Sequence, residues 1–262
     1  MNDLYRELAP VPEAAFRVVE EEATRVLSRM LAGRKIADVS GPHGWTHSAV
    51  DLGTTQRIEA PCDGVAAQRR QVLPLAEIRV PFALSRRELD DVARGSADPD
   101  LEPVAVAARK AALAEDGAIF HGWEAAGIEG IADVATRHEL PANFADYPGV
   151  LAEALDHLKV DGVEGPYAMA LGRRAHTGVM QTFHEGYPVY KHLERLLDAP
   201  LLWAPGLEGG LVVSLRGGDF SLDVGRDFSI GYEDHDADHV RLYLVESFTY
   251  RTLAAEAAVA LA

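Results

Sequence analysis

The sequence has a single cysteine, Cys62, among its 262 residues. An intrachain disulfide is therefore excluded, and a cysteine-based zinc site would need another thiol or several histidines. No apolar run has the length of a transmembrane helix, and the N-terminus MNDLYRELAP lacks the basic and apolar segments of a signal peptide. These absences predict a soluble, cytoplasmic protein with no membrane partner.

Basic residues are also scarce. Lys and Arg total 25 against 41 Asp and Glu, which gives a formal net charge of −16. Such a chain repels nucleic acid overall, so no nucleic-acid partner is expected, although short basic spots remain at Arg69–Arg70 and Arg86–Arg87. Hydrophobic residues make up 48% of the chain and charged residues 25%, a composition typical of a globular protein with a substantial core.

The apolar pattern predicts helices and strands interleaved without a regular strand–helix–strand cycle, which favours an α+β fold. Residues 12–31 are the clearest helix, because Phe16, Val19, Ala23, Val26, Leu27 and Met30 recur every three to four positions. A capping box of Ser85 and Glu88 predicts that a second helix starts there. Further helices are predicted over 103–123, 147–160, from 173 and 187–197, and strands over 167–171, 201–203, 211–215, 220–224, 228–232 and 240–251, with 259–261 as a last edge strand.

Residues 54–84 predict a long hairpin around the turn Pro61-Cys62-Asp63-Gly64. An isolated two-stranded hairpin is only marginally stable in water. It therefore needs a second surface, on this chain or on a neighbouring copy, and this need is a first indication of assembly. Cys62 is expected to be exposed at the tip, where a lone thiol is more often incidental than catalytic.

Two motifs invite a chemical interpretation. Arg216-Gly217-Gly218-Asp219-Phe220 could be a phosphate-binding loop, but such loops open a helix and a strand follows here, which favours a hairpin turn. The second motif, Asp234-His235-Asp236 with Asp238 and His239, could hold a metal ion in a hydrolase. It lacks both the HExxH glutamate and the EF-hand glycine, so a solvated turn between strands is favoured.

The remaining residue patterns supply no evident active site. His184-Glu185 is the best acid–base candidate, and there is no nucleophile elbow or CxxC pair. We therefore expect no bound metal and no cofactor, and the ordered but motif-poor sequence favours a structural role.

A series of short segments then runs through the chain in order: NDLYRELAP (2–10), LAGRKIADV (31–39), GPHGW (41–45), RVPF (79–82), ELDDVARG (88–95), ED (115–116) with IFHG (119–122), GPY (165–167), GYP (186–188), RGGDF (216–220), GRDFSIGY (225–232) and VRLY (240–243). Together these segments resemble the encapsulins, the bacterial nanocompartment shell proteins also labelled linocin- or bacteriocin-like. The resemblance extends over nearly the whole chain.

The resemblance implies the tailed-phage major-capsid fold. In that fold, residues 1–53, 81–132 and 202–262 would form the peripheral domain, residues 54–80 the extended loop that pairs with a neighbouring subunit, and residues 133–201 the axial domain. The compact length is similar to members that build the smallest icosahedral shell, about sixty copies of one chain.

The resemblance also implies a function without catalysis. The shell would enclose cargo enzymes, such as dye-decolourising peroxidases or ferritin-like iron oxidases, that carry C-terminal targeting peptides, and this would connect the particle to oxidative stress or iron storage. The peptide would dock on the inner wall at Leu27, Arg34, Ile36, Asp38, Asp227, Ile230 and Tyr232. Ordinary core packing is the alternative for Ile36, Ile230 and Tyr232. A five-fold pore would be lined by Thr182, Phe183, His184, Glu185, Gly186 and Tyr187.

Two further expectations follow from this resemblance. Arg86-Arg87 occupy the segment where some relatives carry an aromatic residue linked to flavin, so flavin is not expected. A phage or prophage major capsid protein of the same fold is the main alternative, and the charge of −16 argues against a wall that faces a genome.

Overall fold

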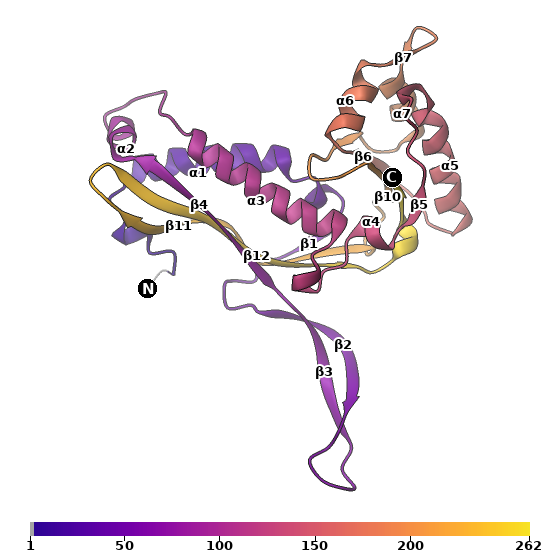
Figure 1. Cartoon of the computed structure of the whole chain (residues 1–262), viewed down its shortest axis with the longest axis horizontal. Helices are drawn as coiled ribbons and strands as arrows, with labels where there is room; N and C mark the ends of the chain where they lie inside the picture. The colour runs from indigo at the N-terminus through magenta and orange to yellow at the C-terminus, as the bar shows by residue number, and fades with distance from the viewer. Residues whose placement is uncertain (1–2) are drawn as a thin grey trace.

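Two separate β-sheets organise the chain, and a long hairpin projects from the body that they form (Figure 1). The computed structural model describes residues 3–262. The four-stranded sheet has the order β1-β11-β12-β4, and its strands are β1 (Asp38–Ser40), β11 (Phe220–His235), β12 (His239–Thr252) and β4 (Ala76–Ser85). The five-stranded sheet has the order β5-β13-β10-β6-β9, with β5 (Thr136–His138), β13 (Ala258–Leu261), β10 (Gly210–Ser214), β6 (Tyr167–Leu171) and β9 (Leu202–Trp203).

Helices α1 (Glu13–Met30) and α3 (Glu102–His121) cover one side of the four-stranded sheet (Figure 1). The periodic apolar residues of α1 are buried against α3, Leu242 and Leu244 of β12 and Phe82 and Leu84 of β4. The short helix α2 (Arg86–Ala93) follows β4 and buries Leu89 in the same cluster. The helical spacing of the sequence therefore identifies the face that packs on the sheet.

The five-stranded sheet is the centre of the second lobe. Every residue of β6, β10 and β13 is buried, as expected of strands covered on both faces. Around them lie α4 (Ile131–Val134), α5 (Tyr147–Val160), α6 (Arg173–Gln181) and α7 (Val189–Leu196) (Figure 1). Short 3₁₀ helices occur at Arg6–Leu8, Gly33–Lys35, Glu124–Ala126, Phe144–Asp146 and Ala255–Ala257.

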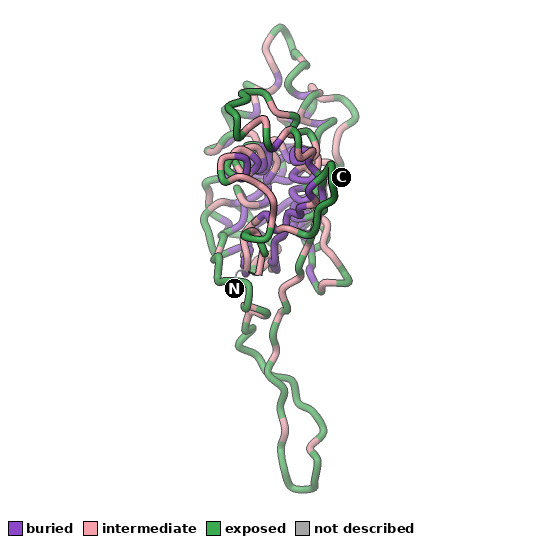
Figure 2. The backbone as a smooth tube through the Cα atoms, turned by 90° about the vertical axis from the view of Figure 1, so that its left-hand side faces the viewer, coloured by how far each residue is buried: buried purple, intermediate pink, exposed green. Residues whose placement is uncertain are grey.

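Strands β2 (Ala49–Ile58) and β3 (Ala67–Pro74) form the projecting hairpin, and within residues 3–262 they pair with no other strand. Its outer part is exposed on both faces (Figure 2), and Cys62 is exposed at its tip. A second, small hairpin of β7 (Phe183–His184) and β8 (Tyr187–Pro188) protrudes from the second lobe (Figure 1). No helix of the described chain is both long enough and apolar enough to span a bilayer.

The α+β class is confirmed, and so are most of the predicted elements. Helix α5 and strand β6 have the predicted bounds, and α1 begins and ends within one residue of the predicted range. The acidic run also proves to be a turn, since β11 ends at His235 and β12 begins at His239. The two strands predicted over 220–232 are instead one long strand, β11, because bulges near Arg226 keep the chain in register with β12.

Four predictions about connections were wrong. Residues 76–84, assigned to the hairpin, belong to β4 and pair with β12, while residues 49–53 extend the hairpin at its other end. The glycine motif 216–220 is no hairpin turn, since it joins β10 of one sheet to β11 of the other. Strand β13 is internal rather than an edge. Ser85 forms no side-chain cap, and the Glu88 carboxylate instead accepts from the Asp100 N–H at 3.2 Å.

The sheet topology also changes the division of the chain. Strands β9, β10 and β13 fall within 202–262, which was assigned to the peripheral domain, yet they complete the five-stranded sheet with β5 and β6. The second lobe is therefore discontinuous in sequence. The alternation of apolar residues in the sequence did not indicate that these strands belong to the second lobe, because it predicts where a strand occurs and not which strand it pairs with.

Candidate functional site

The first candidate surface is the seam between α1 and β11, where the sequence places peptide-docking residues. Leu27, Ile36 and Ile230 are all buried within the chain's own core. Ile36 lies in the apolar cluster of the second lobe, whereas Leu27 and Ile230 lie in the cluster beneath α1. In the single chain, Ile36 and Ile230 are thus packed as ordinary core residues, which was the alternative interpretation. Because they are buried, they could contribute to a surface site only from beneath it.

Tyr232 lies at the edge of the seam and is half-buried against the α1 cluster. Its hydroxyl is 2.6 Å from Nδ1 of His235, and its backbone N–H donates to the Leu4 carbonyl at 2.9 Å. Phe228, which the sequence analysis did not select, is also half-buried on the same cluster. The period-two pattern of 228, 230 and 232 in β11 is the signal that could have identified it.

Arg34 lies at one end of this seam and binds three carboxylates. Its guanidinium forms a two-pronged contact with Glu115, with Nη2–Oε2 at 2.7 Å, and contacts Asp227 at 2.9 Å from Nη1. It also binds Glu246 directly and lies 5.1 Å from the centroid of the Phe228 ring. Of the predicted docking residues, the structure therefore brings Arg34 and Asp227 together with two acids, Glu115 and Glu246, that the sequence did not assign to the site.

Burial governs the protonation of this group of charges, which we call the Arg34 cluster: Arg34, Glu115, Asp227 and Glu246. Burial opposes the charge of Arg34, but hydrogen bonding and attraction from Glu115, with Glu246 and Asp227, raise its pKa above the ordinary value. Burial, together with the charge and hydrogen bond of Glu115, raises the pKa of Glu246 well above its usual range. One guanidinium thus contacts three carboxyl groups, and the raised pKa of Glu246 favours its protonated form.

Asp116 is a second buried acid beside the cluster. Its carboxylate accepts hydrogen bonds from the N–H groups of Ala32 (3.0 Å) and Gly33 (2.9 Å), and so holds the segment after α1 against α3. Burial raises its pKa to about 7 despite these two donors.

These raised pKa values predict a pH-dependent stability. Between the ordinary pKa of a carboxyl near 4 and the raised value, the folded chain binds protons that the unfolded chain releases, so stability is greatest below this window and falls as pH rises through it. We expect the free energy of unfolding, measured in urea, to fall between pH 5 and pH 8 by about 1–3 kcal/mol more in the wild type than in Glu246→Gln. Equal pH slopes for the two proteins would contradict a protonated Glu246.

Asp38 lies apart from the seam, on β1. Its Oδ2 accepts from the Gly218 N–H, and the Arg216 guanidinium binds Asp219 at 2.8 Å in the same loop. Gly217 and Gly218 have φ near +84° and +83°, which explains the two glycines of the motif. Asp38 therefore fixes the connection between the two sheets.

The predicted pore residues are contiguous in the protruding β7–β8 hairpin. Glu185 (φ 50°) and Gly186 (φ 80°) form its two-residue turn, in the left-handed conformation that such turns require. Phe183 is 64% exposed, and the Thr182 hydroxyl donates to the Gly178 carbonyl at 2.7 Å. Tyr187 is anchored on the lobe, since its ring lies against His192 and beneath Arg195.

The acidic run 233–239 forms and stabilises the turn between β11 and β12. Asp236 accepts from the N–H groups of Asp238 and His239, which closes the turn, and it shares Arg241 with Asp234. These backbone donors and Arg241 lower the pKa of Asp236. Across residues 3–262, no three His, Cys, Asp or Glu side chains are grouped as a metal site would need.

The two lobes and projecting hairpin define a class of proteins, those with a capsid-like fold. The chain is similar to the virus-like particle from Pyrococcus furiosus, with a TM-score of 0.67 and 14% identity over 94% of this chain and 99% of the other. It is also similar to the capsid of Myoviridae phage XM1, with a TM-score of 0.54 and 12% identity over 86% and 88% of the two chains. At these identities the likeness establishes the fold alone, and it confirms the tailed-phage capsid fold.

Sequence comparison identifies the family within that class. The chain belongs to the family described as encapsulating protein for peroxidase, whose model matches residues 1–249. A type 1 encapsulin shell protein of Rhodospirillum rubrum is 52% identical over 270 residues, which cover all of this chain and 96% of the relative. One of Mycobacterium tuberculosis is 48% identical over 263 residues, with 100% and 99% covered. Both relatives are named for a shell, a structural role, which confirms the prediction of a non-catalytic encapsulin.

Proposed function

We propose that copies of this chain assemble into a closed icosahedral shell, of the smallest size, that encloses a cargo enzyme in the bacterial cytoplasm. The single observation that carries this proposal is the match to type 1 encapsulin shell proteins over the whole chain. The hairpin supports it, because β2 and β3 pair with no other strand of the described chain, and both faces of their outer part need a partner.

Electron microscopy and size-exclusion chromatography of the purified chain test this proposal. Uniform hollow particles are the expected result, and a monomer or dimer would contradict it. Nucleic acid inside the particles that resists nuclease until the shell is disrupted would instead favour the phage or prophage capsid alternative.

For the cargo, we place the docking surface at the seam between α1 and β11. Its floor is Leu27 and Ile230, its half-buried wall is Phe228 and Tyr232, and its charged end is Arg34 with Asp227. An apolar surface with one charged end suits a short, mainly apolar peptide, such as the C-terminal tail of a peroxidase or ferritin-like protein. Modest affinity is sufficient, because many copies on one wall raise the effective concentration of sites.

Tyr232→Asp is the informative substitution for this surface, because Ile36→Asp would place a charge in the core and disturb folding. We expect Tyr232→Asp shells to form normally and to lose at least about nine-tenths of co-purifying cargo, since a buried aromatic anchor contributes about 2 kcal/mol or more. Cargo is measured by quantitative gel analysis of shells isolated from cells that co-express it. Tyr232→Phe is the matched control and should retain cargo. Full loading of the aspartate variant would place docking elsewhere.

For the pore, we propose that the β7–β8 hairpins of five copies meet around an axis of the shell. The exposed Phe183 at the hairpin supports this arrangement, because a large apolar side chain with no cover in the single chain is suited to a contact between copies. His184 and Glu185 would then be repeated around the opening.

A further inference from the structure

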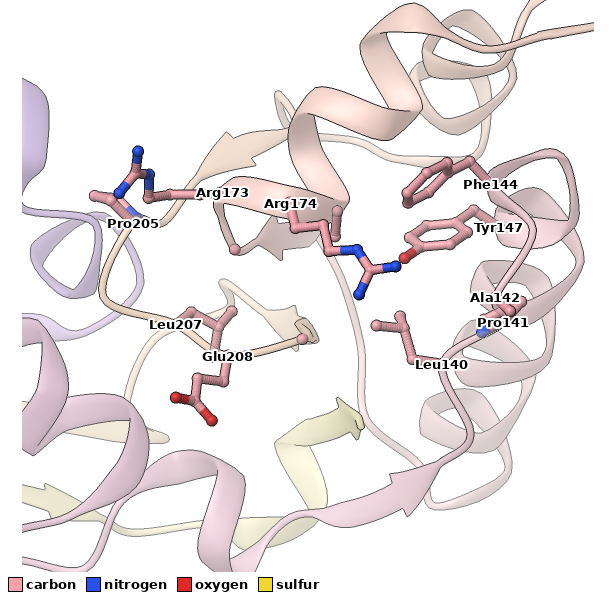
Figure 3. Close-up of a pocket in the computed structure, with 13 residues that line it drawn as sticks. Leu140, Pro141, Ala142, Phe144, Tyr147, Arg173, Arg174, Pro205, Leu207 and Glu208 are labelled. Atoms are coloured by element: carbon pink, nitrogen blue, oxygen red, sulfur yellow. The ribbon is translucent and has the colours of Figure 1, made fainter.

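A cavity of about 640 Å³ lies in the second lobe, away from the seam, the hairpins and the Arg34 cluster (Figure 3). The segment before α5, the first turn of α6 and residues 205–209 enclose it. Leu140, Phe144 and Leu207 supply apolar walls, whereas Tyr147, Arg173 and Arg174 supply polar groups. A volume of this size and a mainly apolar wall with a few polar groups are typical of small-molecule sites.

Tyr147 is the unusual member of this wall. Its side chain is only 1% exposed, yet its hydroxyl has no hydrogen-bond partner among the described residues. Figure 3 shows the hydroxyl directed toward the guanidinium of Arg174 in the cavity. Because the hydroxyl is unpaired and opens into the cavity, it can donate a hydrogen bond to a ligand bound there.

The start of α6 adds further donors at the same place. Gly172 is its N-cap and offers no side chain to bind the first amides of the helix. Gly172, Arg173, Arg174 and Ala175 all line the cavity, so the positive end of the helix opens into it. Neither Arg173 nor Arg174 forms an ion pair with any described residue, although acids outnumber bases in the chain.

One acid also lines the cavity. Figure 3 shows the Glu208 carboxylate on the opposite side, directed away from Arg174. The Glu208 backbone N–H donates to the ring of His121 at 3.0 Å, which fixes this segment against α3. Arg174 and the start of α6 therefore face the cavity, and no carboxylate lies beside Arg174, whereas Arg173 is directed away past Pro205 (Figure 3).

We propose that this cavity binds a small phosphate monoester with a flat apolar body. The phosphate would accept from the Tyr147 hydroxyl, the Arg174 guanidinium and the first amides of α6, a combination that suits a doubly charged anion. The apolar body would pack against Leu140, Phe144 and Leu207. No residue of this site belongs to the docking seam or to the β7–β8 hairpin, so the shell would carry a ligand in its wall independently of cargo.

Isothermal titration of assembled shells with phenyl phosphate tests this inference. We expect one site per subunit, weaker binding of inorganic phosphate and no binding of phenol. Tyr147→Phe should weaken binding at least about fivefold and Arg174→Gln at least about tenfold, the loss expected for hydrogen bonds to a charged group. Arg87→Gln, on the exposed face of α2, removes one positive charge elsewhere and should leave binding unchanged.

Tyr147→Phe keeps the packed ring and removes only the unpaired hydroxyl, so its shells should assemble, as electron microscopy will verify. Equal affinity of wild-type and Tyr147→Phe shells would overturn the proposal. So would tight binding of phenol, which would make the cavity a purely apolar site. Binding by dissociated subunits but not by shells would also overturn it, because a neighbouring copy would then cover the cavity.

Discussion

Arg34→Ala is expected to lower the free energy of unfolding of the subunit by about 3–5 kcal/mol, the usual cost of removing one partner from a buried ion pair. Glu115 and Glu246 are fully buried, and Arg34 is the cation that both contact. Without the guanidinium, the Glu115 side chain would lose its two-pronged partner and remain in the core. The expected readout is the denaturant midpoint of the unfolding transition at neutral pH.

The Arg34 cluster offers an internal control for this prediction. Adding Glu246→Gln to Arg34→Ala removes one of the stranded acids, so the double variant should recover part of the lost stability. Arg34→Lys keeps the charge but not the two-pronged geometry, and should fall between the wild type and alanine. If Arg34→Ala unfolds at the wild-type midpoint, the cluster contributes no net stability.

This prediction also separates stability from docking at Arg34. The sequence resemblance assigns Arg34 to a peptide site, whereas the structure commits its guanidinium to two buried acids of the same chain. Loss of cargo in Arg34→Ala would thus be ambiguous, because the seam itself would be destabilised. Tyr232 is the better probe of docking, since it is half-buried and outside the cluster.

The Arg34 cluster shows why part of the site escaped prediction. Arg34 is 81 residues from Glu115 and 212 from Glu246, and no local pattern records contacts over such distances. Glu246 lies in the strand-like run 240–251, where a solvent-facing position is the ordinary interpretation of a charged residue. A carboxylate in a strand can be predicted to be buried only when the partner strands and the inward face of the sheet are known.

Local structure, in contrast, follows closely from local sequence. The three-to-four spacing in 12–31 and in 147–160 predicts α1 and α5 because each helix buries one face. The five-stranded sheet was missed as a unit because its members come from residues 136–138, 167–171, 202–214 and 258–261. Strands β6, β10 and β13 are buried throughout, so no alternation of polar and apolar residues shows which way their faces point. Motif resemblance supplied the capsid fold that local patterns alone did not.

Shortening the β2–β3 hairpin is expected to abolish shell formation while leaving the subunit folded. None of residues 52–71 is buried in the single chain, and Asp51 is paired with Val72. Replacing 52–71 by Asn-Gly would therefore close the two strands with a two-residue turn that matches their twist. Because no core contact is lost, we expect the unfolding free energy to change by no more than about 1 kcal/mol.

The same deletion removes an extended element whose two faces are both exposed in the single chain. If these faces pair with neighbouring copies, the shortened chain should elute as a small species in size-exclusion chromatography, with an unchanged circular dichroism spectrum. Cys62→Ser alters only the exposed tip and should still form shells. Intact shells from the shortened chain would instead show that the remaining surfaces of the two lobes are sufficient for assembly, and that the hairpin has another purpose.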